Sequence, residues 1–71
     1  MYSEEKYLQK LVEEKIPITL FLLDGIQRRG HIDGYDEYTI QFTDSVVNNS
    51  AAEMVYKHAI STIKPFRQVK L

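Results

Sequence analysis

The stretch Met54–Ile63, which reads MVYKHAISTI, decides how the rest of this chain is interpreted. β-forming residues precede and follow its basic pair, Lys57-His58. The pattern predicts two short strands that meet at a basic step, where side chains point out of the sheet rather than into a core. A fixed cation beside a titratable ring suits an anionic, planar ligand. A solvated turn that happens to be basic is the alternative interpretation.

Size and composition predict one small globular domain over residues 1–71, because 44% of the 71 residues are hydrophobic. A core of this size is marginal and usually needs disulfides, a metal or self-association. The sequence has no cysteine and two histidines, which excludes disulfides and disfavours a structural zinc site. Self-association is therefore the expected support, and no cofactor is expected.

The charge pattern offers no general attraction for nucleic acid, since nine Lys and Arg face ten Asp and Glu for a net charge of −1. Binding of a polyanion would have to come from local clusters. No apolar segment approaches membrane-spanning length, and the acidic N-terminus does not resemble a signal peptide. The expected location is the cytoplasm.

The N-terminal segment predicts a helix over about residues 3–14. Ser3 is a candidate cap, and Glu4 and Glu5 would meet the positive end of the helix dipole. Apolar residues at helical spacing follow, so one face is expected to pack on the sheet. Pro17 cannot continue this helix.

Strand signals occupy about residues 18–64. Ile18–Leu23 is nearly continuous in apolar residues, and Asp24-Gly25 is the dipeptide typical of a tight hairpin. A second strand is expected from Ile26 onward. Gly30 and Gly34 interrupt it, which indicates a bulge or a sharp bend.

The second half of the chain predicts three further strands. Tyr38–Thr43 alternates as a half-buried strand does, and Asn48-Asn49-Ser50 indicates a turn before the stretch quoted above. Pro65 ends the last strand and leaves a short basic tail over residues 65–71. The expected fold is mainly β with an N-terminal helix: an SH3-like, five-stranded bent sheet or open barrel.

Several segments together point to one known family. They are Tyr56–Thr62, Ile16-Pro17, Asp24-Gly25-Ile26, Gly30 and the corner Tyr35–Tyr38. On these segments the chain, from about residue 4 to residue 65, resembles the Hfq branch of the Sm-like (LSm) RNA-binding family, and Tyr56–Thr62 reproduces its signature motif.

The resemblance implies a fold, an assembly and a function. The fold is a helix on a five-stranded bent sheet, and the assembly is a homohexamer whose subunits close edge to edge into a ring. Such a ring removes the exposed sheet edges and enlarges the small core. The implied function is that of an RNA chaperone in post-transcriptional regulation and stress response, which binds small RNA and mRNA and is not an enzyme.

The resemblance further implies a uridine-binding site on the helix-bearing face. Tyr38 would stack on a base, Lys57 would donate to a base carbonyl and His58 would reach ribose or phosphate. Glu4 and Glu37 occupy positions that are usually Gln in the family. A carboxylate cannot donate to a uracil carbonyl and repels phosphate, so weaker and more salt-sensitive uridine binding is expected.

A second site, for adenine-containing repeats, is implied on the opposite face. Its residues are Phe21, Gly25, Ile26, Gln27, Arg28, Arg29 and Thr62. The alternative is that Phe21 belongs to the core and the arginines only solvate an outer strand. Glu53 replaces a Gln common in the family, which weakens the expectation of adenine discrimination. The rim segment Val12–Lys15 keeps only Lys15 as a basic residue, so RNA annealing is not expected.

Two other functions fit parts of the sequence. A nuclease could use His58 with Lys57, but acid/base cleavage of RNA generally needs two positioned groups, and His31 has no evident partner. A structural or peptide-binding SH3-like module without RNA binding is the second alternative. RNA binding that depends on Lys57 and Tyr38 would distinguish the predicted function from both.

Overall fold

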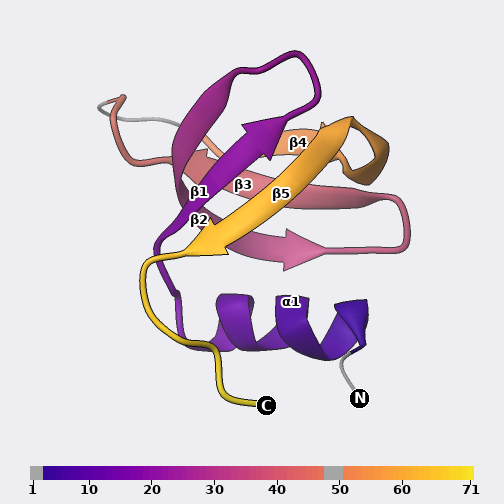
Figure 1. Cartoon of the computed structure of the whole chain (residues 1–71), viewed down its shortest axis with the longest axis vertical. Helices are drawn as coiled ribbons and strands as arrows, with labels where there is room; N and C mark the ends of the chain where they lie inside the picture. Colours follow the sequence, from indigo (N-terminus) through magenta and orange to yellow (C-terminus); the bar gives the residue numbers. More distant parts are fainter. Residues whose placement is uncertain (1–2, 48–50) are drawn as a thin grey trace.

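The computed structural model describes residues 3–47 and 51–71, and its strands form one bent antiparallel sheet (Figure 1). The elements are α1 (Glu4–Glu13), β1 (Ile18–Leu22), β2 (Gln27–Tyr35), β3 (Thr39–Asp44), β4 (Glu53–Tyr56), the short 3₁₀ helix η1 (Lys57–Ala59) and β5 (Ile60–Pro65). The strand order is β4-β3-β2-β1-β5. The predicted fold of a helix followed by a five-stranded bent sheet is confirmed. The turn expected at Asn48-Asn49-Ser50 lies outside the described residues.

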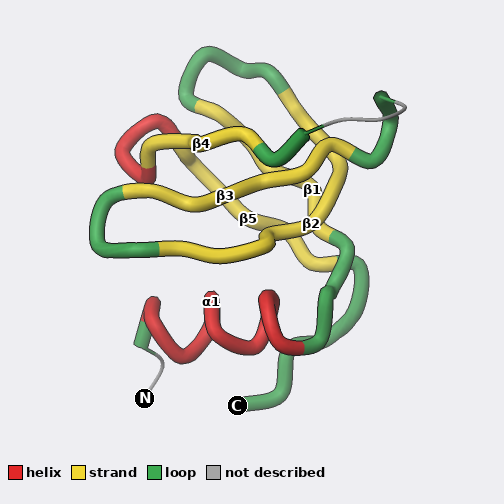
Figure 2. Tube along the Cα trace, turned by 180° about the vertical axis from the view of Figure 1, so that it is seen from behind, coloured by secondary structure: helices red, strands yellow, loops and turns green. Residues whose placement is uncertain are grey.

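Helix α1 begins where the cap was predicted. The Ser3 side chain accepts a hydrogen bond from the Lys6 backbone N–H at 3.1 Å, and Glu4 and Glu5 lie in the first turn. Leu8 and Leu11 are buried, so the helix packs its apolar face against the sheet (Figure 2). No helix in the described part of the chain is both long and apolar enough to cross a membrane.

The core lies between α1 and the concave side of the sheet. The buried hydrophobic residues are Leu8, Leu11, Ile16, Ile18, Leu20, Ile32, Ile40, Phe42 and Val69. Every element except β4, η1 and β5 contributes to this list, and the last three add half-buried residues such as Val55, Ile60 and Ile63. The basic step at Lys57 is therefore placed at the margin of the core rather than inside it.

The segment after Pro65 does more than the basic tail expected from its sequence. The Phe66 backbone N–H donates to the Pro17 carbonyl at 3.0 Å, and Arg67 Nη2 lies 2.9 Å from Glu14 Oε1. These contacts bring Val69 against the core, where it is 8% exposed. The tail thus fastens the end of α1 to the start of β1.

The hairpin and the bend in the sheet follow the predicted glycines. Gly25 has φ of +91°, which glycine adopts without strain, and the Leu22 backbone N–H donates to the Ile26 carbonyl at 2.9 Å across the turn. The register between β2 and β3 shifts between Ile32 and Gly34, which marks a bulge. This irregularity increases the twist that wraps β2 around the core.

Candidate nucleic-acid interface

A turn stabilised by Asp36 sets the position of Tyr38. The Asp36 carboxylate accepts hydrogen bonds from the backbone N–H groups of Tyr38 and Thr39, at 2.9 and 2.8 Å. These two bonds are the main reason that the pKa of Asp36 lies below its ordinary value. Strand β3 consequently starts at Thr39, and Tyr38, expected inside that strand, lies before it with 69% of its surface exposed. An exposed aromatic ring is available for stacking.

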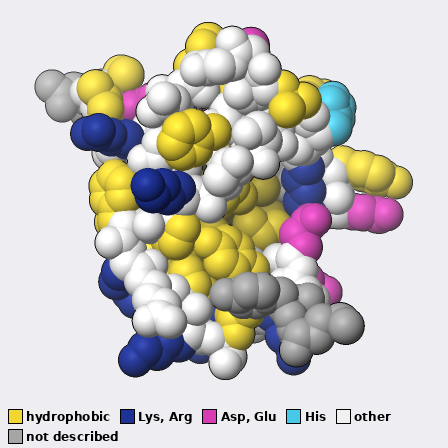
Figure 3. All heavy atoms as spheres, viewed as in Figure 1, with side chains coloured by type: hydrophobic (Ala, Val, Ile, Leu, Met, Phe, Trp, Pro, Cys, Tyr) yellow, Lys and Arg dark blue, Asp and Glu magenta, His cyan; other side chains and the backbone are white. Residues whose placement is uncertain are grey.

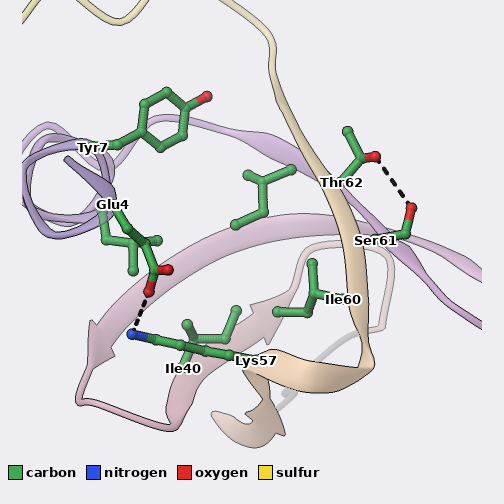
Figure 4. A pocket seen from close by; sticks show the side chains of 9 residues that line it. Glu4, Tyr7, Ile40, Lys57, Ile60, Ser61 and Thr62 are labelled. Carbon is green, nitrogen blue, oxygen red and sulfur yellow. Dashed lines mark hydrogen bonds and ion pairs between the residues drawn. The ribbon is translucent and has the colours of Figure 1, made fainter. Parts of the chain in front are cut away.

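Lys57 lies beside this turn and reaches across to α1. Its backbone N–H donates to the Tyr38 carbonyl at 2.8 Å. Its ammonium Nζ lies 2.7 Å from Glu4 Oε1 and 5.9 Å from the centre of the Tyr35 ring. Figure 4 shows the Lys57 and Glu4 side chains pointing toward each other from η1 and α1. The Glu4 side chain is 70% exposed and that of Lys57 22% exposed. The lysine side chain is thus largely covered by protein, whereas the carboxylate is largely in solvent.

Two adjoining cavities open beside this ion pair. The first, of about 290 Å³, is lined by Glu4, Tyr7, Leu8, Ile40, Lys57, Ile60, Ser61, Thr62 and Ile63. The second, of about 550 Å³, is lined by Glu4, Glu5, Tyr35, Asp36, Glu37 and Lys57. Hydrophobic side chains gather in the hollow between the sheet and α1 in Figure 3. One cavity is therefore mostly apolar, and the other places four carboxylates around one ammonium.

His58 stands apart from this group within one chain. Its ring stacks on Tyr56, with 5.4 Å between centroids and an interplanar angle of 26°. Neither cavity is lined by His58. Of the residues predicted for this face, the structure brings Glu4, Glu37 and Lys57 together around one cavity. Tyr38 is joined to Lys57 through its backbone carbonyl, and its ring lines neither cavity. The roles of Tyr38 and His58 stay predictions.

Sequence reasoning did not single out Glu5, Tyr35 and Asp36 as site residues, although all of them line the acidic cavity. Two of them belong to the corner Tyr35–Tyr38 that supported the family resemblance. The sequence therefore contained a signal for Tyr35 and Asp36, the turn motif. It did not show that α1 lies beside this turn.

On the opposite face, the strand register places some of the predicted site residues side by side. Phe21 on β1 pairs with Gln27 on β2 and with Thr62 on β5. Arg29 is two residues from Gln27 and therefore faces the same side of the sheet. Phe21 lies outside the buried core, and the hairpin residue Ile26 is 53% exposed. The outer surface thus presents an aromatic ring, an amide, a hydroxyl and a cation together.

Arg28 points to the other side of β2 and is held there. Its guanidinium is hydrogen-bonded to Asp44, at 3.0 and 3.2 Å, and to Glu53, and lies 5.3 Å from the Phe42 ring centre. The bond with Glu53 is the main cause that raises the pKa of Arg28 and lowers that of Glu53. The pKa of Asp44 is lowered first by the Val46 backbone N–H and then by Arg28. The Arg28 side chain therefore links β2 to β3 and β4; these two contacts are called the Arg28 clasp below.

Replacing Arg28 with glutamine is expected to lower the melting temperature by a few degrees at neutral pH, because it breaks both bonds of this clasp. Both carboxylates have lowered pKa values in the folded protein, so their contribution is present above the unfolded pKa and disappears as pH falls through the folded value. The difference between wild type and variant should therefore shrink below about pH 4.

Thermal unfolding followed by circular dichroism across this pH range checks the expectation. Arg29→Gln is the matched control: it removes the same charge from the next residue, which makes no side-chain ion pair within the described residues. If both variants melt alike at neutral pH, the clasp is not a stabilising contact.

The described residues contain no group of three or more His, Cys, Asp or Glu side chains that could hold a metal ion. The side chains on the two faces include aromatic rings, hydrogen-bonding groups and charges. Stacking, hydrogen bonding and charge are the interactions by which proteins hold unstacked bases of single-stranded nucleic acid.

Comparisons with known proteins show which sequences and folds this chain is similar to. The sequence model of the Hfq protein family matches residues 4–70. Among solved structures, the chain is similar to a crystal structure of the pleiotropic translational regulator Hfq, with 31% sequence identity and a TM-score of 0.77. The match covers 86% of this chain and 95% of that one.

Proposed function

Because the chain belongs to the Hfq family, whose members are Sm-like RNA-binding proteins and RNA chaperones rather than enzymes, we propose that it regulates RNA after transcription as a homohexameric ring in the cytoplasm. The ring binds U-rich single-stranded RNA on its helix-bearing face and A-rich RNA on the opposite face. The RNAs are small regulatory RNA and mRNA. Membership of a non-enzymatic family sets aside the nuclease alternative.

The observation that carries this proposal is the ion pair between Lys57 and Glu4 beside the turn that presents Tyr38. Lys57 and Glu4 line the mostly apolar cavity and supply hydrogen-bonding groups, and the exposed ring of Tyr38 in the adjacent turn supplies a stacking surface. Stacking of a base on an aromatic side chain contributes roughly 1–3 kcal/mol. Repetition of such a pocket around a ring gives useful affinity without a basic surface.

The outer face supports the second half of the proposal. Phe21, Gln27 and Thr62 are cross-strand neighbours, and an amide such as that of Gln27 pairs well with adenine. Arg29 is the arginine that is free to contact phosphate, because Arg28 is held by Asp44 and Glu53. The contribution of Arg28 to RNA binding on this face is accordingly expected to be smaller than that of Arg29.

Assembly into a ring is supported by the two ends of the sheet. Strands β4 and β5 are its outermost strands, so each offers a row of unpaired backbone groups to another copy. Met54 and Tyr56 on β4 are 60% and 50% exposed. Pairing of β4 with β5 of the next copy covers these side chains and joins the sheets.

Binding of labelled oligo-U and oligo-A to the purified protein tests the proposal, with the mass in solution measured on the same sample. We expect a hexamer that binds both oligonucleotides simultaneously, because the two sites lie on different faces. A protein that binds neither contradicts the proposal, and a peptide-binding or structural SH3-like module then becomes the better explanation.

A further inference from the structure

The ion pair between Glu4 and Lys57 keeps unused hydrogen-bonding capacity on both partners. One N–H of the ammonium is directed at Glu4 Oε1, at 2.7 Å, which leaves two N–H groups. The carboxylate has about four acceptor sites, and no other described side chain donates to it. The pair therefore presents a cationic donor directly beside a group that only accepts.

This order of donor and acceptors matches one edge of guanine. Guanine presents an acceptor, O6, followed by two donors, N1–H and the 2-amino group. Lys57 would donate to O6, while the Glu4 carboxylate accepts from both donors. Uracil presents an acceptor, a donor and a second acceptor, so its O2 would face a carboxylate oxygen and the two would repel each other.

The surroundings of the pair favour the same base. Glu5, Asp36 and Glu37 line the acidic cavity with Glu4, so a base that offers more donors and fewer carbonyl oxygens is preferred there. The adjoining cavity of about 290 Å³ has an apolar wall that includes the half-buried Tyr7, Ile60 and Ile63 and can take the face of a purine ring. Figure 4 shows the ion pair at the side of this apolar wall.

We propose that the helix-side pocket binds guanine in preference to uracil, with Glu4 as the residue that sets this selectivity. The inference rests on the proposed function, because it needs RNA to reach this face, and it refines which base the pocket holds best. U-rich RNA remains a ligand of this pocket. Lys57 and the stacking surface favour its binding, and the Glu4 carboxylate weakens it.

Three hexanucleotides test the preference on the wild-type protein: oligo-U, alternating U and G, and alternating U and inosine. Inosine keeps O6 and N1–H but lacks the 2-amino group. We expect the guanine sequence to bind about tenfold tighter than oligo-U, with the inosine sequence in between, as a two-bond contact to a base edge allows. Fluorescence anisotropy at fixed salt measures the three affinities.

Glu4→Gln tests the residue, because an amide offers a donor where the carboxylate offers only acceptors. We expect this variant to bind oligo-U more tightly than wild type and to lose the advantage of guanine over inosine. Glu13→Gln is the matched control: it removes the same charge from the same helix, outside both cavities. It should keep the wild-type order of the three affinities.

The results separate this inference from the proposed function. Oligo-U that binds as tightly as the guanine sequence, or an equal shift in Glu4→Gln and Glu13→Gln, overturns the inference and leaves RNA binding in place. Failure of wild type to bind any RNA overturns both. Circular dichroism of the variants ensures that the compared proteins are folded.

Discussion

Gly30→Ala is expected to destabilise the protein more than alanine at Gly34, because a Cβ at Gly30 meets backbone atoms. A Cβ at Gly30 would lie 2.0 Å from the backbone oxygen of Thr43 and 2.8 Å from Cζ of Phe42. Gly30 is buried on β2 and pairs with β1 on one side and β3 on the other, so the strands cannot separate without breaking the sheet. Overpacking of this kind costs about 3 kcal/mol.

That cost is large for a domain of this size, because small domains have total stabilities toward the lower end of roughly 5–15 kcal/mol. The melting temperature should fall by more than about 10 °C, as measured by circular dichroism at one protein concentration. Gly34→Ala is the control, since a Cβ there meets only the Gln41 side chain, at 3.2 Å for Oε1. Equal stability of Gly30→Ala and wild type would contradict the close approach of β2 and β3.

The helix and the hairpin were predictable because their signals are local. Ser3 and the first-turn glutamates define one end of α1, and Asp24-Gly25 carries the positive φ that its turn needs. The burial of Val69 was not predictable in this way. It depends on the contacts of Phe66 and Arg67 with residues about 50 positions earlier, which no local pattern encodes.

The candidate site shows the same division between local and distant information. Arg28 and Arg29 are identical in type and adjacent, yet one clasps three strands and the other faces solvent, and only the strand register separates them. Lys57, Tyr38 and Glu4 were all predicted from the family resemblance, but the ion pair between Glu4 and Lys57 forms because α1 packs across the sheet. Distances between such residues follow from tertiary packing, not from their spacing in sequence.

Lys57→Met is expected to lower affinity for RNA on the helix-bearing face by about tenfold or more, since a hydrogen bond from a charged group contributes roughly 1.5–3 kcal/mol. Methionine keeps an unbranched apolar side chain and removes the ammonium, which lies 5.9 Å from the centre of the Tyr35 ring. Four carboxylates would then line the acidic cavity without a cation, so repulsion of phosphate adds to the lost donor. Repetition of the change in every subunit of the proposed ring multiplies the effect.

Lys10→Met is the matched control for this loss, because it also removes a lysine–glutamate ion pair, formed with the C-cap residue Glu14 at 3.7 Å and outside both cavities. Anisotropy with oligo-U and with the alternating U and G sequence should show a loss in Lys57→Met alone. Oligo-A should bind all three proteins equally, because the outer face is unchanged. Retention of oligo-U binding by Lys57→Met would remove Lys57 from the interface, and loss of oligo-A binding as well would point to a disrupted assembly rather than to a missing contact.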